Sequence, residues 1–440
     1  MGGKRIELLI LTLSVLLCLC SCTQVISPRS KPNDSAQPTN AVQSTDASLS
    51  FRIIWPDYSG RGEAVQRIVN TYNAKNSDAV VMIGGDEDFS NIQTLLDSKA
   101  PILYVLPYRY VKYFGAKGYL WDITEAFQVE KTVFYPQVWD LGGINGVTYG
   151  IPWLGHAMCL LYNKTLLQNA SVEAASINSL PALVHALEQV EKNTDAKGFG
   201  LVGANSNDIS WMVNQFLYGF GASLVSSDGT TVTINSEQSR AAINFYKNVL
   251  GAHAQATWLE DTGTEVMDHF RNQEVAFEIQ GIWGVTDIQK NGDPFDVGVI
   301  SMADISLCAE VGPMMLAVPT GLDETQLNRA FALIRYLISP EAQEQILLGE
   351  YSPEHDAYYP FRTPIRKDMV NNETFQAYPD YIKFIEGFQN PSIDVPVPAW
   401  QIIKDDLYGP GLHKVMSGEM SVDDFLTQIE TEGNRILKSD

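Results

Sequence analysis

The chain has 440 residues and a formal net charge of -22 at pH 7, with 45% hydrophobic and 19% charged residues. This length is too great for one ordinary hydrophobic core and predicts two lobes of ordinary domain size. Because so negative a surface repels phosphate backbones, the composition argues against a nucleic-acid partner. The acidity is more typical of a soluble surface than of a site for a cationic ligand.

The N-terminus carries the elements of an export signal. Two basic residues at positions 4 and 5 precede an apolar run from Leu8 to Leu19, which is too short to span a bilayer permanently. The run closes on Leu19-Cys20-Ser21-Cys22, which resembles the bacterial lipobox, where the last cysteine receives a diacylglycerol and the chain is cleaved in front of it. This resemblance implies that residues 1–21 are a lipoprotein signal peptide and that Cys22 carries the lipid, with palmitate among its acyl chains and Cys20 as the alternative acceptor.

Residues 22–50 have almost no large apolar side chain and are rich in Ser, Thr, Pro and Asn. Such a segment buries too little surface to offset the entropy that it would lose on ordering. We therefore expect a flexible linker, which gives the rest of the chain reach from a membrane surface.

From residue 51 onward, strand and helix signals alternate. Short β-rich runs cover residues 51–55, 79–83 and 102–106. Apolar residues recur at helical spacing over 64–72, 89–98, 180–190 and 236–250. Ser236 begins the last of these segments, where its hydroxyl can cap the helix N-terminus. The alternation predicts an α/β protein.

The sequence lacks the motifs of familiar catalytic sites. It has no HExxH, no Walker A loop, no GxSxG elbow and no dinucleotide fingerprint after a strand. Its six histidines show no metal-ligand spacing. Cys159 and Cys308 could form a disulfide or stay as two buried free thiols, and no spacing decides between these alternatives. We therefore expect a protein that is not an enzyme and that needs no metal and no cofactor.

Aromatic residues recur at the breaks between predicted elements. Aromatic faces stack on the C–H faces of sugar rings, and nearby polar side chains bind the hydroxyl groups. The alternative is that these residues belong to the core or to its rim. The residues concerned are Trp55, Tyr108, Tyr110, Trp153 and Trp283 at strand ends and loops, and Trp211 and Trp400 at the start of helical stretches.

One segment resembles a family signature. Residues Gly146 to Pro152, followed by Leu160 to Leu166, are similar to the "YG-hydrophobic-P … LYYNK" segment of family 1 extracellular solute-binding proteins, the sugar-binding components of ABC importers. Further stretches similar to the family follow in the same order, at Gly219–Gly221, Ala241–Leu250, Gly281–Trp283, Ser339–Gln343 and Met416–Val422.

The resemblance implies an α/β, two-lobed periplasmic-binding-protein-like fold of type II, with a hinge between discontinuous lobes. The chain would cross between lobes near 153–157, 299–303 and 349–353. Lobe 1 is then expected to contain residues 51–153 plus 300–350, and lobe 2 residues 157–298 plus 351–440. A ligand would bind in the cleft between the lobes.

The resemblance also implies which residues contact the ligand. His156 stands at a hinge position where maltose-type relatives carry a carboxylate, so this chain departs from the maltodextrin pattern there. The other candidates come from the loop after the first strand, the loop after the third strand, the aromatic positions and a late proline-containing segment: Trp55, Asp57, Arg61, Tyr108, Arg109, Trp153, Trp211, Trp283, Arg362 and Trp400.

We thus expect a lipid-anchored, monomeric solute-binding protein on the outer face of the cell membrane. It would capture a monosaccharide or oligosaccharide by closing its lobes and would deliver it to the permease of an ABC importer. One alternative is a binding protein for a non-sugar solute such as a polyamine or a peptide. The other is a lipid-anchored glycosidase, which would need two carboxylates facing each other across the cleft.

Overall fold

The computed structural model of the chain describes residues 49–54, 61–86, 88–360, 362–377, 379–393, 395 and 397–438. The predicted signal peptide, Cys22, Trp55, Asp57 and nearly all of the predicted linker lie outside these residues. Within them, no helix has both the length and the apolar character that a membrane span requires.

The first sheet, as far as the described residues show it, has six strands in the order β15-β6-β12-β3-β1-β2. Strands β1, β2 and β3 run parallel, and β12, β6 and β15 are added in antiparallel pairs. The strands are β1 (Ser50–Arg52), β2 (Val81–Ile83), β3 (Ile102–Pro107), β6 (Gly150–Gly155), β12 (Met314–Ala317) and β15 (Thr363–Pro364).

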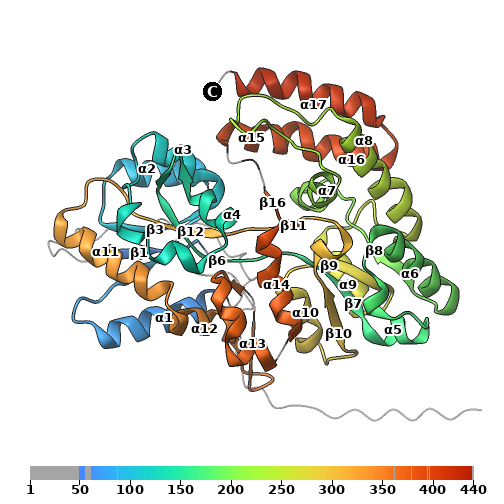
Figure 1. Cartoon of the computed structure of the whole chain (residues 1–440), viewed down its shortest axis with the longest axis horizontal. Helices are drawn as coiled ribbons and strands as arrows, with labels where there is room; N and C mark the ends of the chain where they lie inside the picture. The colour runs from blue at the N-terminus through green and yellow to red at the C-terminus, as the bar shows by residue number, and fades with distance from the viewer. Residues whose placement is uncertain are drawn as a thin grey trace, which may run out of the picture. The chain divides into compact units, whose positions relative to one another are not determined.

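Helices cover both faces of the first sheet, as the alternation along β3 shows. Leu103 and Val105 belong to the cluster that includes the apolar sides of α1 (Arg61–Lys75), α11 (Glu324–Leu337) and α12 (Pro340–Leu348). Tyr104 and Leu106 belong instead to the cluster of α2 (Phe89–Asp97) and α3 (Tyr108–Ala116). Figure 1 shows these helices around the sheet. Because successive strand residues point to opposite faces, the burial of all six β3 residues follows from this two-sided cover.

The second sheet has the strand order β10-β7-β9-β8 in the described part of the chain. Its strands are β7 (Cys159–Asn163), β8 (Lys197–Gly200), β9 (Val275–Gln280) and β10 (Val297–Ile300). Leu160 packs in the cluster that includes α6 (Leu180–Asn193), whereas Cys159 and Leu161 pack with α10 (Ile282–Lys290) and α14 (Pro379–Glu386). Cys159 and Cys308 are both buried free thiols, which decides between the two alternatives left open by the sequence.

The remaining elements pack around these sheets. The helices are α4 (Pro136–Trp139), α5 (Lys164–Asn169), α7 (Asn207–Gly219), α8 (Glu237–Asn244), α9 (Gly263–Arg271), α13 (Glu373–Ala377), α15 (Pro398–Ile403), α16 (Gly409–Ser417) and α17 (Val422–Leu437). Short strand pairs are β4 (Gly143–Ile144) with β5 (Val147–Thr148), β11 (Ala309–Glu310) with β16 (Pro391–Ser392), and β13 (Glu350–Ser352) with β14 (Ala357–Tyr359).

Most of the local sequence predictions are confirmed. The predicted helices over 64–72, 89–98 and 180–190 are α1, α2 and α6, and the strands over 79–83 and 102–106 are β2 and β3. Ser236 caps α8 by accepting a hydrogen bond from the Ser239 backbone N–H, as expected. The helix predicted over 236–250 instead changes at Phe245 into a π-helical turn.

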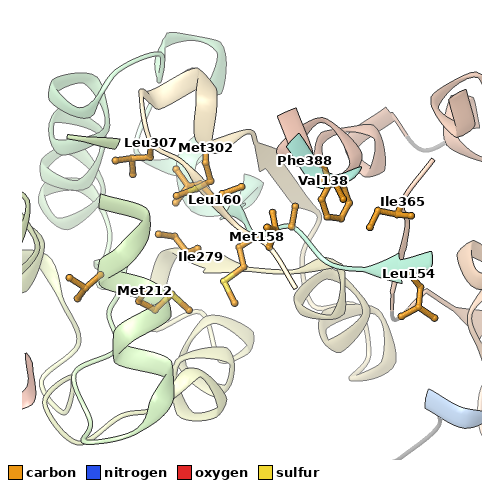
Figure 2. Packing of buried hydrophobic residues seen from close by; sticks show 14 of the residues in the cluster. Val138, Leu154, Met158, Leu160, Met212, Ile279, Met302, Leu307, Ile365 and Phe388 are labelled. Atoms are coloured by element: carbon orange, nitrogen blue, oxygen red, sulfur yellow. The ribbon is translucent and has the colours of Figure 1, made fainter. Parts of the chain in front are cut away.

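The chain passes from one sheet to the other at neighbouring places. Strand β6 ends at Gly155 in the first sheet and β7 begins at Cys159 in the second. The return passage, between β10 and β12, pairs with it through an antiparallel bridge between Ala157 and Val311. Figure 2 shows Met158 between Leu160 and Leu154, which are members of one continuous buried cluster. The core therefore runs through the crossing without interruption.

The chain does not cross to the second sheet near residues 349–353, where the last crossing was predicted. Strand β15 pairs with β6, and the Glu350 carboxylate accepts a hydrogen bond from the Ala64 backbone N–H of α1. Glu350 and β15 therefore lie with the first sheet, although the resemblance assigned 351–440 to lobe 2. The later residues Met369 and Phe375, together with α14, belong to the buried cluster of Cys159 and Val299 in the second sheet.

Glu278 is a carboxyl group inside the second sheet. It lies on β9, is 1% exposed, and one of its oxygens has no hydrogen-bond partner in the structure. Burial raises the pKa of Glu278 well above its usual value, Asp287 adds to the rise, and Arg271 opposes it. The folded protein thus holds the proton more tightly than the unfolded chain does.

We predict that Glu278→Gln removes part of the pH dependence of stability. Since the folded pKa is raised, the contribution of Glu278 to stability is complete below the unfolded pKa and is lost as pH rises toward the folded pKa. Urea unfolding at pH 5 and pH 8 should therefore show a smaller loss of stability for Glu278→Gln than for the wild type. The exposed Glu419→Gln variant serves as control and should behave as the wild type does. An equal loss in all three proteins would contradict the prediction.

Candidate functional site

A cavity of about 380 Å³ lies beside the place where the chain passes between the sheets. The first-sheet side contributes the start of α3 and of β12, and the second-sheet side contributes α7, α9, the end of β9 and the start of α10. The crossing segments themselves supply His156, Met158, Glu310, Val311 and Gly312. The cavity is thus built from segments that are far apart in the sequence.

Six of the predicted ligand-binding residues line this cavity. They are Tyr108, Arg109, His156, Trp211, Trp283 and Arg362. Trp55, Asp57 and the side chain of Arg61 lie outside the part of the chain that the structure describes. The structure therefore brings together candidates from the start of α3, the crossing, α7, α10 and the residue before β15.

Two predicted residues, Trp153 and Trp400, belong to the core instead. Trp153 is fully buried on β6, with its ring 5.5 Å from that of Phe51 in an edge-to-face contact. Trp400 is 1% exposed on α15, and its ring lies 5.8 Å from that of Tyr408. Neither lines the cavity, because β6 is covered on both faces and α15 turns Trp400 toward the core cluster.

Trp283 is an aromatic side chain of the cavity that several neighbours hold in place. Its indole Nε1–H donates a hydrogen bond of 2.9 Å to Oε1 of Gln280. The six-membered ring lies so close to Gly281 that a Cβ there would come within 2.1 Å of it. The ring of His156 makes an edge-to-face contact at 5.1 Å, and the guanidinium of Arg362 lies over the indole at 5.5 Å. The family-like Gly-x-Trp spacing thus has a steric cause, since only glycine leaves room for this ring.

His156 and Glu310 form a pair at the crossing. Nε2 of His156 lies 2.6 Å from Oε2 of Glu310, and both side chains are largely buried. The backbones are tied as well, since Met158 N–H donates to Glu310 O and Gly312 N–H donates to His156 O. The crossing therefore places an imidazole and a carboxylate side by side at the cavity. Sequence reasoning missed Glu310 because no motif marks it.

Asp208 and Trp211 lie on the first turns of α7. Ser206 caps this helix, and Oδ2 of Asp208 accepts a hydrogen bond of 3.0 Å from the backbone N–H of Gly263. The ammonium group of the buried Lys404 lies 5.7 Å from the centre of the Trp211 ring. Sequence reasoning missed Asp208, for which the cap sequence Ser206-Asn207-Asp208 was the available signal.

Methionines form the apolar part of the lining. Met158, Met212, Met267 and Met314 all line the cavity. The amide of the buried Gln215 lies 3.8 Å from the Met158 sulfur and 3.6 Å from the Met212 sulfur. Methionine side chains are flexible and polarisable, so this wall can adapt to the shape of a bound group.

The charges that line the cavity are balanced. Among the described lining residues, Arg109 and Arg362 carry positive charge, and Asp208 and Glu310 carry negative charge. No group of three or more His, Cys, Asp or Glu side chains in the described residues is placed to hold a metal ion. Aromatic rings, balanced charges and flexible thioethers suit a polar solute of low net charge.

Residues 67–383 match the model of a protein family described as bacterial extracellular solute-binding protein. The chain belongs to this family. The match covers most of the chain and confirms the resemblance drawn from the Gly146–Pro152 segment. No curated protein is similar enough in sequence to match the chain.

Solved structures share the fold at low sequence identity. The sugar-binding protein MalE from Xanthomonas citri aligns with a TM-score of 0.74 and 16% identity over 89% of this chain and 98% of its own. An ABC substrate-binding protein from Listeria monocytogenes in complex with cycloalternan aligns with a TM-score of 0.65 and 20% identity, over 89% of this chain and 98% of its own. UgpB from Mycobacterium tuberculosis in complex with glycerophosphocholine aligns with a TM-score of 0.68 and 17% identity, over 89% of this chain and 98% of its own. The predicted two-lobed α/β fold of periplasmic binding proteins is thereby confirmed.

We predict that Glu310→Ala destabilises the folded protein by roughly 1–3 kcal/mol, because it leaves a largely buried His156 nitrogen without its partner. Glu310→Gln keeps an acceptor and should lose less. Urea unfolding at constant pH measures both effects. Glu432→Ala removes an exposed pair with Arg435 and is the control, in which we expect little change. If Glu310→Ala were as stable as the control variant, the pair would not hold the crossing.

Proposed function

We propose that this solute-binding protein captures a carbohydrate in the cavity between its two sheets and delivers it to the permease of an ABC importer. The observation that carries the proposal is the arrangement around Trp283. A fixed indole ring stands beside the hinge in contact with the imidazole of His156, and the polar side chains of Arg109 and Asp208 line the same cavity. Such a combination of an apolar ring face with hydrogen-bond donors suits a sugar, whose C–H faces and hydroxyl groups need both.

The remaining lining supports the same class of solute. Asp208 on α7 offers an acceptor, Arg109 on α3 offers donors, and Trp211 offers a second ring. The balanced charges favour a neutral sugar over a polyamine, which would need an excess of carboxylates. The solved relatives that bind sugars share only the fold with this chain, so they support the class of ligand and do not identify it.

Binding without chemistry is the mechanism that we propose. The carboxylates of the cavity already accept hydrogen bonds from the protein, Asp208 from Gly263 and Glu310 from His156. A glycosidase would need one of them as an acid and the other as a base or nucleophile on opposite sides of the scissile bond. The ligand would instead shift an equilibrium between open and closed forms.

The site of action is proposed from the sequence alone. The lipobox-like Leu19-Cys20-Ser21-Cys22 supports a lipid anchor at Cys22 on the outer face of the membrane, and residues 22–50 would then be the tether. The anchor would keep a monomeric receptor close to its importer.

The carbohydrate class is tested by calorimetry and thermal shift against glucose, galactose, xylose, sucrose, maltose, maltotriose and spermidine. We expect at least one sugar to raise the melting temperature, because it binds only the folded state. Trp283→Ala should weaken the binding of that sugar about tenfold or more. The exposed Trp121→Ala variant lies outside the cavity and should bind as the wild type does.

Three outcomes would contradict this proposal or the site that it names. A shift with spermidine and with no sugar would assign the cavity to a cationic solute. Release of reducing sugar from a glycan by the purified protein would show an enzyme. Unchanged affinity in Trp283→Ala would remove this residue from the site.

The anchor is tested by mass spectrometry of the mature protein. We expect the N-terminus at Cys22 with a diacylglyceryl group, and we expect Cys22→Ser to shift the protein from the membrane fraction to the soluble fraction. The matched variant Cys20→Ser should stay at the membrane. The opposite result would make Cys20 the lipidated residue, and a soluble wild-type protein would rule the anchor out.

A further inference from the structure

One face of the Trp283 indole is covered by another residue of the same chain, and both residues line the cavity. The guanidinium carbon of Arg362 lies 5.5 Å from the centre of the indole, over the ring. A planar guanidinium stacks well on an indole, which is the most favourable aromatic partner of a cation. Arg362 thus occupies the kind of surface on which a sugar ring would stack.

The indole has little freedom to turn away from Arg362. Its Nε1–H is bound to Gln280, its six-membered ring rests against Gly281, and the edge contact with His156 adds a further restraint. A ligand that stacks on Trp283 must therefore approach a ring whose position is fixed. The ring cannot present a different face without losing the hydrogen bond to Gln280.

The backbone at Arg362 is also fixed, so the movable part is its side chain. Thr363, the next residue, pairs with Gly155 of β6 in the first sheet. On the other side, the Thr286 hydroxyl of α10 donates a hydrogen bond to the Pro360 carbonyl. The Arg362 side chain is long and has several rotatable bonds, so it can leave the indole while its backbone stays in place.

Resting on the proposed carbohydrate function, we propose that Arg362 is a competitor of the solute for Trp283 and so sets the affinity of the site. A sugar ring stacks on Trp283 only when the guanidinium moves off the indole. Arg362 then lowers the affinity for every solute that uses this ring. Solutes too small to replace the stacking contact are disfavoured most.

If Arg362 competes with the solute, its truncation should change the affinity in the opposite direction from that expected of a ligand contact. A contact residue loses affinity when it is truncated, as Trp283 should. A competitor gains affinity when it is truncated, because the ligand no longer has to displace it. The lower end of the range of cation–π strengths predicts a gain of about two- to fivefold.

The first arm of the test is calorimetry with the sugar of the panel that gives the largest thermal shift. Arg362→Ala should bind it about two- to fivefold more tightly than the wild type. The gain should vanish when Trp283→Ala is also present, because the two residues act through one contact. If Arg362→Ala fails to fold, Arg362→Gln removes the stacking cation with a smaller change of volume. This variant should also bind the sugar more tightly than the wild type.

The second arm needs no ligand. Acrylamide quenching of fluorescence is measured in the wild type and in Arg362→Ala, each with and without Trp283→Phe, and the difference isolates the Trp283 signal. Trp283 should be quenched more strongly in Arg362→Ala, because the guanidinium no longer covers it.

The two arms separate the possible failures. Weaker sugar binding in Arg362→Ala, or a gain that persists without Trp283, overturns the competitor role. If Trp283 is quenched equally in Arg362→Ala and in the wild type, Arg362 does not cover the indole, whichever ligand binds. If no sugar binds any variant while the quenching rises as expected, the proposed carbohydrate function is wrong, and so is the role of Arg362 as a competitor of a sugar. The contact in which Arg362 covers Trp283 would still be confirmed.

Discussion

The pairing of two chain crossings is the constraint on which the site depends. Residues 156–158 and 310–312 run side by side between the sheets, joined by the Met158–Glu310 and Gly312–His156 backbone hydrogen bonds. The second of these segments begins in β11, which pairs in parallel with β16, so a third part of the chain joins them. Backbone pairing at the crossing fixes where one sheet ends and the other begins, and the cavity forms beside it.

The crossing also explains why the cavity combines such different residues. Each sheet presents to it the loops and helix starts that follow strands: Tyr108 and Arg109 after β3, and Trp283 after β9. Polar backbone groups and side chains are available at strand ends without being buried inside a sheet. A change in the angle between the sheets would alter the distance between these groups, which is how a bound solute can favour a closed form.

The sequence predicts the local elements and part of the site. Apolar spacing finds α1, α2 and α6, and the motif resemblance finds Trp283 and His156. The resemblance wrongly places Trp153 and Trp400 at the cavity. Both lie in the core, because helices that are far away in the sequence cover the faces of β6 and α15 that carry them. Glu310 and the cavity methionines carry no motif, and Asp208 is marked only by the helix cap at Ser206. These residues are brought together only by folding. The last lobe boundary fails for the same reason, since the pairing of β15 with β6 is a long-range contact.

The decisive measurement is a crystal structure of the protein with its tightest-binding sugar. We expect the sugar to lie in the cavity beside His156, with a ring against Trp283 and the guanidinium of Arg362 displaced from the indole. A sugar bound elsewhere, such as in the separate pocket lined by Lys164 and Asp380, would rule this site out. A sugar in the cavity that leaves Trp283 covered by Arg362 would rule out the competition between Arg362 and the sugar.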